Sequence, residues 1–112
     1  MSATVTPATP NGRVVTLTSI DADWEFTDDA DYKAFLGERD LVIYDIWFFP
    51  GAVADKLIIN DTTVAGAEWK LESISGEHVR LEIGGKKMYP VIDQSECTLS
   101  AGAFVTIYYG RV

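Results

Sequence analysis

The stretch Leu41-Val-Ile-Tyr-Asp-Ile-Trp-Phe-Phe-Pro50 decides the fold of this 112-residue chain. Successive residues of a β-strand point to opposite faces of its sheet. One face would carry Leu41, Ile43, Asp45, Trp47 and Phe49, and the other Val42, Tyr44, Ile46 and Phe48. Because both sets are largely apolar, we expect the strand to be covered on both faces, by the rest of the domain or by another molecule.

The composition is that of a soluble globular protein. Hydrophobic residues make up 47% of the chain and charged residues 23%, and the length allows one proper core. No apolar stretch approaches the roughly 18 residues that span a bilayer, so we expect no membrane contact. Residues 1–10 lack the basic start and apolar run of a signal peptide, and the single cysteine, Cys97, fits a reducing compartment. Residence inside a cell is therefore expected.

The negative charge is concentrated in one part of the sequence. The formal net charge is −8, and residues 21–45 hold nine acids against Lys33 and Arg39, a balance of −7. The remaining eight acids and seven bases give −1. Since an acidic surface repels phosphate, direct nucleic-acid binding is not expected.

The chain pattern predicts a short arm and one domain. Residues 1–12 are rich in Thr, Ala and Pro and are expected to form a flexible N-terminal arm, either disordered or laid against a neighbour. Residues 13–112 are expected to form a single domain. Strands are predicted at 13–20, 41–49, 56–60, 68–73, 78–83, 88–92, 97–100 and 103–109.

One helix and one hairpin complete the predicted elements. Residues 27–37 suit a helix that ends at Gly37, with an apolar stripe made by Tyr32, Phe35 and Leu36. Gly84-Gly85 predicts a two-residue hairpin turn that would set Glu82 opposite Lys87 and Leu81 opposite Met88. Seven or eight short strands and one helix indicate a mainly β fold, a single β-sandwich or jelly-roll-like domain.

No residue pattern defines a catalytic, metal or cofactor site. Asp21-Ala-Asp-Trp-Glu25 begins like a calcium loop, but Phe26 and Tyr32 stand where an EF-hand needs Gly and Glu. His78 is the only histidine and falls on the polar face of its strand, so a surface histidine is expected. Acidic neighbours of Cys97 would raise the pKa of its thiol, which argues against a reactive thiolate. We therefore expect neither enzymatic activity nor a cofactor.

Asp45 is the residue that this pattern explains least. A carboxylate in the middle of an apolar strand costs several kcal/mol if it is buried without a partner. It is expected to pair with an arginine, to accept backbone donors, or to mark a subunit boundary. A small enzyme would need a polar pocket that contains Asp45 or His78, and the sequence reveals no such pocket.

Three stretches give the chain a resemblance to a known class of protein. They are Asp21-Ala-Asp-Trp-Glu-Phe26, the strand end Phe49-Pro50 with the following Asp55-Lys-Leu-Ile-Ile-Asn60, and Tyr89-Pro-Val-Ile-Asp-Gln-Ser-Glu-Cys-Thr98. In this layout the chain resembles the small β-sandwich structural proteins of tailed phages and prophages. The resemblance implies a virion structural or assembly protein, found in the virion or the host cytoplasm, with other virion structural proteins as partners.

The expected function is contact between proteins. The chain is expected to be a homo-oligomer, because repeated subunits in rings or lattices need self-complementary apolar patches. The expected interface residues are Tyr44, Asp45, Trp47, Phe48 and Phe49. The alternative is a module that binds a small ligand, most plausibly a carbohydrate. Two or three coplanar exposed aromatic rings beside polar side chains would distinguish that alternative.

Overall fold

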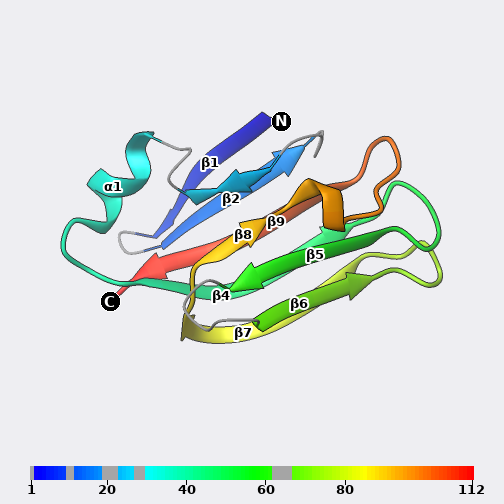
Figure 1. Cartoon of the computed structure of the whole chain (residues 1–112). Coiled ribbons are helices and arrows are strands. Elements are labelled where there is room, and N and C mark those ends of the chain that lie inside the picture. Colours follow the sequence, from blue (N-terminus) through cyan, green and yellow to red (C-terminus); the bar gives the residue numbers. More distant parts are fainter. Residues whose placement is uncertain (1, 10–11, 19–22, 27–29, 62–66) are drawn as a thin grey trace.

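Two antiparallel sheets pack face to face in the computed structural model, which describes residues 2–9, 12–18, 23–26, 30–61 and 67–112 (Figure 1). The five-stranded sheet has the order β1 (Ser2–Thr9), β2 (Gly12–Thr18), β9 (Phe104–Arg111), β4 (Leu41–Phe49) and β7 (Val79–Lys87). The four-stranded sheet has the order β3 (Trp24–Glu25), β8 (Pro90–Ile92), β5 (Lys56–Asp61) and β6 (Ala67–Glu72). The predicted mainly β sandwich is confirmed.

The core lies between the inner faces of the two sheets. Alternate residues of each strand point inward and exclude water from the space between the sheets. Its fully buried side chains include Leu17, Ile43, Ile46, Phe48, Val105 and Ile107 from the larger sheet and Leu57, Ile59, Leu71 and Ile92 from the smaller one. Burial of this apolar area is the main term that stabilises the fold.

The helix α1 (Ala30–Leu36) covers one end of the sandwich, as Figure 1 shows. Its predicted apolar stripe is confirmed, since Tyr32 and Phe35 are buried and Leu36 packs against the core. Gly37 ends the helix with φ of +58°, and its N–H donates to the carbonyl of Lys33 at 2.9 Å. The first predicted helix residues, 27–29, lie outside the described residues.

Residues 2–9 form a strand, where the sequence led us to expect an arm. The strand β1 pairs with β2 from Ser2↔Thr18 to Thr9↔Gly12, with one irregularity between Pro7 and Thr9. β-branched residues are frequent in this segment, which suits a pleated conformation. Pro7 fits because β1 is at the edge of its sheet, where a missing N–H is tolerated.

The strand β4 has the predicted limits but not the predicted faces. A bulge at Tyr44 inserts one extra residue, because Ile43 pairs with Tyr109 and Asp45 with the adjacent Tyr108. The alternation therefore changes phase after Tyr44. Ile43 points into the core ahead of the bulge, and Ile46 and Phe48 do so after it. The outer face of β4 then carries Asp45, Trp47 and Phe49.

The predicted hairpin at Gly84-Gly85 is wrong. The chain continues through both glycines as one strand, β7, which pairs with β4 on either side of them. Ile43 pairs with Lys86 and Asp45 with Glu82, so three residues of β7 face the single residue Tyr44. Both glycines have positive φ, +78° and +91°, which lets them absorb this mismatch without turning the chain back.

The predicted strand at 97–100 is also absent. A short 3-10 helix, η2 (Gln94–Glu96), ends immediately before this segment, and Asp93 caps it by accepting from the N–H of Ser95. Only an isolated bridge joins Thr98 to Lys56 of β5. The local bonds of the Asp93 side chain favour the helical turn of η2 over an earlier start of a strand.

Candidate interaction surface

A row of four rings lies on the outer face of the five-stranded sheet. β9 supplies Phe104, its neighbour β4 supplies Trp47 and Phe49, and His78 immediately precedes β7, the strand on the other side of β4. Phe49 pairs directly with Phe104 across the strands, and Trp47 pairs with Arg80. We call His78, Trp47, Phe49 and Phe104 the aromatic row. Topology brings these residues together from three distant parts of the sequence.

The rings of the aromatic row stack on one another. The centroids of Phe49 and Phe104 are 4.4 Å apart with an interplanar angle of 11°. Trp47 lies 6.4 Å from Phe49 at 15°, and His78 lies 5.3 Å from Trp47 and 5.6 Å from Phe49. His78 is exposed and the other three side chains are partly exposed. The sheet therefore presents a continuous aromatic strip to the outside.

Asp45 forms the expected pair with an arginine. Its two carboxylate oxygens accept from Nε and Nη2 of Arg80, both at 3.2 Å. These hydrogen bonds raise the pKa of the Arg80 guanidinium above its ordinary value. The guanidinium also lies 5.1 Å from the ring centroid of Trp47, in cation–π contact. Asp45 therefore has a structural partner, and the ion pair holds the Arg80 guanidinium beside Trp47.

The structure separates the five interface residues predicted from sequence. Trp47 and Phe49 belong to the aromatic row, and Asp45 lies beside it. Tyr44 is 40% exposed and packs its ring against Gly85, where an added Cβ would lie 3.3 Å from the ring. Phe48 is a core residue with no exposed area, because the bulge turns it inward. Its side chain is therefore not accessible to a partner.

Sequence reasoning missed Phe104 and the stacking of His78. In the sequence Phe104 is only the first aromatic residue of an ordinary apolar strand, and its cross-strand pairing alone places it against Phe49. His78 was correctly predicted at the surface, but its aromatic neighbours are far away in the sequence. The sequence shows the apolar spacing of the strands that carry Phe104 and precede or follow His78, but it does not show that these two residues meet.

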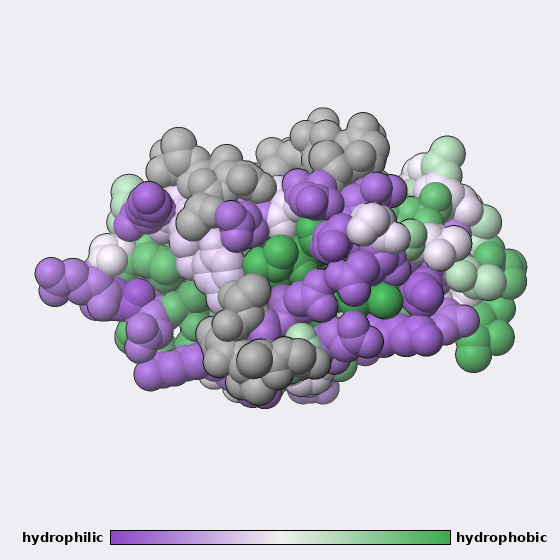
Figure 2. Space-filling model, viewed as in Figure 1, coloured by the Kyte–Doolittle hydropathy of each residue, from purple (hydrophilic) through white to green (hydrophobic). Residues whose placement is uncertain are grey.

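Exposed apolar side chains continue from the aromatic row onto one end of the sandwich. The loops that follow Phe49 and precede His78 carry Val53, 65% exposed, and Ile74, 82% exposed. The two loops touch, since Gly76 faces the Val53 side chain. Figure 2 shows apolar surface gathered at this end of the molecule, on the right.

Asp55 holds this end of the sandwich together. Its carboxylate, only 2% exposed, accepts from the N–H groups of Gly51, Ala52 and Ser100 and from the Ser100 hydroxyl at 2.7 Å. Burial opposes ionisation, but these bonds outweigh it and lower the pKa of Asp55. Gly51 fits only without a Cβ, which would lie 2.4 Å from the carbonyl oxygen of Ala101. The loop backbone beneath the apolar end is therefore tightly fixed.

The opposite outer face is polar. The strand β6 points Glu68, Lys70 and Glu72 outward, as its alternation predicts, and Lys70 lies 3.8 Å from Glu72. Asn60 of β5 donates to Glu96 at 2.9 Å. Figure 2 shows mainly hydrophilic atoms over β5 and β6. The contrast with the aromatic row distinguishes the two outer faces.

The remaining candidates for chemistry are dispersed. Burial, together with the charges of Glu96 and Asp93, raises the pKa of the half-buried Cys97. Within the described residues no three His, Cys, Asp or Glu side chains gather into a group that could hold a metal ion. Of the calcium-like stretch, residues 21–22 lie outside the described residues, and Asp23 accepts from the N–H of Gln94 at 3.0 Å.

Comparisons with known proteins give no family for the chain. No family model, no curated protein and no solved structure matches it. In the part of the chain that the structure describes, no helix has the length and apolar content needed to cross a membrane.

Proposed function

We propose that this protein is a non-enzymatic structural or assembly protein that associates with copies of itself through the outer face of its five-stranded sheet. The observation that carries the proposal is the aromatic row, a partly exposed apolar strip that continues into Val53 and Ile74. Folding does not require an apolar outer face, because the core is formed by the inner faces of the sheets and the apolar stripe of α1. Apolar strips of this kind mark interaction sites in soluble proteins.

The composition of this surface suits a protein partner. Trp and Arg are the residue types most enriched among interface hot spots, and Trp47 and Arg80 lie in contact here. The partner we propose is a second copy, since repeated assembly needs only one self-complementary patch. The proposed setting is the virion of a tailed phage or prophage, or its assembly in the host cytoplasm. That setting rests on the sequence resemblance described above.

Carbohydrate binding is the second candidate, and the ring geometry makes it the weaker one. A sugar stacks on the free face of an aromatic ring. Phe49 and Phe104 are nearly parallel, but a separation of 4.4 Å means that they stack face to face instead of sharing one plane. The face of Trp47 is in contact with Arg80. The edges of the rings are what this surface offers, and edges suit the side chains of a protein partner.

Light scattering of the wild type and of Trp47→Ala tests the proposal. We expect the wild type to form an oligomer at micromolar concentration. Loss of a central hot-spot Trp costs about 2 kcal/mol per copy, and a self-complementary contact contains two copies, so the variant should associate roughly 1,000-fold more weakly. Lys70→Ala, on the polar outer face, is the control and should associate like the wild type. A wild type that stays monomeric at high micromolar concentration contradicts the proposal, and glycan binding without self-association would favour the second candidate.

A further inference from the structure

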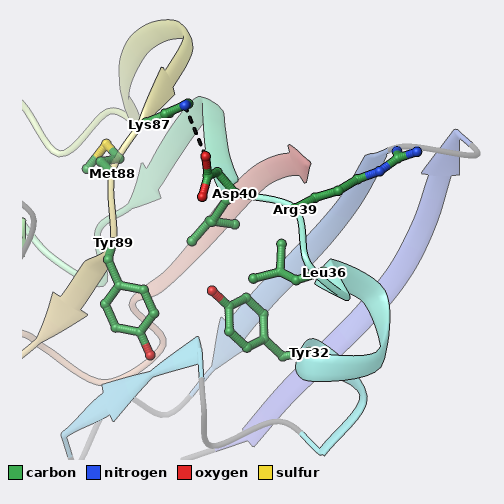
Figure 3. A pocket seen from close by; sticks show the side chains of 8 residues that line it. Tyr32, Leu36, Arg39, Asp40, Lys87, Met88 and Tyr89 are labelled. Atoms are coloured by element: carbon green, nitrogen blue, oxygen red, sulfur yellow. Dashed lines mark ion pairs between the residues drawn. The ribbon is translucent and has the colours of Figure 1, made fainter. Parts of the chain in front are cut away.

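A pocket opens beside α1 (Figure 3). The helix lies at the other end of the sandwich from the loops that join β4 to β5 and β6 to β7 (Figure 1). The helix, the start of β4 and the link between β7 and β8 surround a cavity of about 410 Å³. This volume lies within the range of small-molecule sites, about 300 to 1,000 Å³. The pocket shares no residue with the aromatic row, so its function is a separate question.

The inside of the pocket is apolar and preformed. Three of its residues are almost completely buried: Met88 at 1%, Tyr32 at 5% and Leu41 at 7% exposure. Leu36 and Tyr89 form partly buried walls. The rings of Tyr32 and Tyr89 meet edge to face with centroids 6.3 Å apart, which holds both walls in place. An apolar ligand body of ring size would be stabilised here by burial.

The polar groups of the pocket are mainly hydrogen-bond donors. Nζ of Lys87 lies at the mouth, 3.0 Å from Oδ2 of Asp40, and both side chains are about two-thirds exposed. Such an exposed ion pair is weak, so a ligand carboxylate can replace Asp40 at the ammonium. Figure 3 shows the Tyr32 hydroxyl directed into the space beside Tyr89, and the guanidinium of Arg39 pointing away from the ion pair.

The pocket is less negative than the chain as a whole. At its mouth the Lys87 ammonium and the Asp40 carboxylate balance each other, whereas the whole chain carries −8. Burial, and then the neighbouring Tyr89 and Tyr109, raise the pKa of Tyr32 to about 12. Its hydroxyl therefore keeps its proton at neutral pH and can donate to a carboxylate.

We propose that this pocket binds a small organic acid with an aromatic or branched aliphatic body. The body lies against the partly exposed Leu36 and Tyr89 and on the small exposed part of Leu41. The carboxylate pairs with the Lys87 ammonium in place of Asp40 and accepts a hydrogen bond from the Tyr32 hydroxyl. The two donors set the orientation, and the apolar floor supplies most of the affinity.

An NMR titration of the full chain with 3-phenylpropionate tests this proposal, with 3-phenylpropanamide as the neutral counterpart. We expect saturable shifts of the backbone amides of Leu41, Met88 and Tyr89, with a dissociation constant of about 1 mM for the acid. The amide should bind about fivefold more weakly, because it lacks the ion pair. Equal affinities, no saturable shift, or shifts confined to the aromatic row would overturn the proposal.

Two variants and one control distinguish binding at this site from nonspecific binding. Lys87→Met keeps the length of the side chain and should reduce the affinity for the acid to that for the amide, while the affinity for the amide stays unchanged. Lys70→Met, an ion-paired lysine on the outer face of β6, should change neither affinity. Leu36→Phe fills the pocket and should abolish binding of both probes in a folded protein. Binding that survives Leu36→Phe places the ligand elsewhere and refutes the site.

Discussion

The outer face of the five-stranded sheet carries Trp47, Phe49 and Phe104, whereas that of the four-stranded sheet carries Glu68, Lys70 and Glu72. Both sheets contribute to the same core, so folding places the same demand on their inner faces. Only the outer faces are free to differ. The polar face is what an isolated sandwich needs for solubility, and the proposed self-association would account for the aromatic face.

Substitutions on the two faces of β4 should give the largest difference in the free energy of unfolding. Phe48 and Phe49 are adjacent and chemically identical, but one points into the core and the other outward. We expect Phe48→Ala to lower the free energy of unfolding by about 3 to 5 kcal/mol. Phe49→Ala should lower it by only about 1 kcal/mol, since its ring is partly exposed. Urea denaturation of both variants measures this difference, and equal losses would show that the bulge at Tyr44 is misplaced.

The free energy of unfolding should depend on pH through Asp55, which holds together the loops beside the aromatic row. Its folded-state pKa lies below the unfolded value of about 3.9, so the ionised carboxylate stabilises the fold above that pH. As pH falls through about 4 toward the folded-state pKa, this stabilisation is lost. Asp55→Asn should cost about 2 to 3 kcal/mol at pH 7 and reduce the loss of stability between pH 5 and pH 3.

Denaturation of the wild type and Asp55→Asn across this pH range measures both effects. Asp93, also a carboxylate with a lowered pKa but only partly buried beside η2, offers the comparison. Asp93→Asn should retain most of the wild-type pH dependence. An unchanged slope in Asp55→Asn would mean that the Asp55 carboxylate does not hold these loops.

The smallest expected effect concerns the contact between the bulge residue Tyr44 and Gly85 on the paired strand β7. Gly84 and Gly85 both have positive φ, but only at Gly85 would an added Cβ touch Tyr44. Gly84→Ala should cost about 1 kcal/mol of backbone strain, and Gly85→Ala about 1 kcal/mol more. Thermal melts of the two variants compare these costs. If Gly85→Ala is no worse than Gly84→Ala, Tyr44 does not pack on Gly85.

Local patterns were enough to predict most elements of this fold. The limits of β4, the apolar stripe of α1 and the glycine stop at Gly37 all follow from short-range spacing and backbone preference. The face assignment failed because one extra residue at Tyr44 shifts the phase, and a bulge leaves no mark in an apolar run. Gly84-Gly85 was the available signal, but it suits a bulge opposite Tyr44 as well as a hairpin.

The candidate site was only half visible in the sequence. Trp47 and Phe49 were identified because they share one strand. Phe104 and His78 join them through the strand order β9-β4-β7, which is set by long-range pairing and has no local signature. The partner of Asp45 was expected to be an arginine, but its identity as Arg80 depends on the same pairing.

Hydroxyl-radical footprinting at low and high protein concentration tests the central claim most directly, because it reports the exposure of individual side chains. Self-association through this face predicts that Trp47, Phe49 and Phe104 are oxidised readily at low concentration and become protected as the concentration rises. Val91, a partly exposed side chain on the four-stranded sheet, should react equally in both conditions. Equal oxidation of the aromatic row at every concentration, up to the high micromolar range, would contradict self-association through this face.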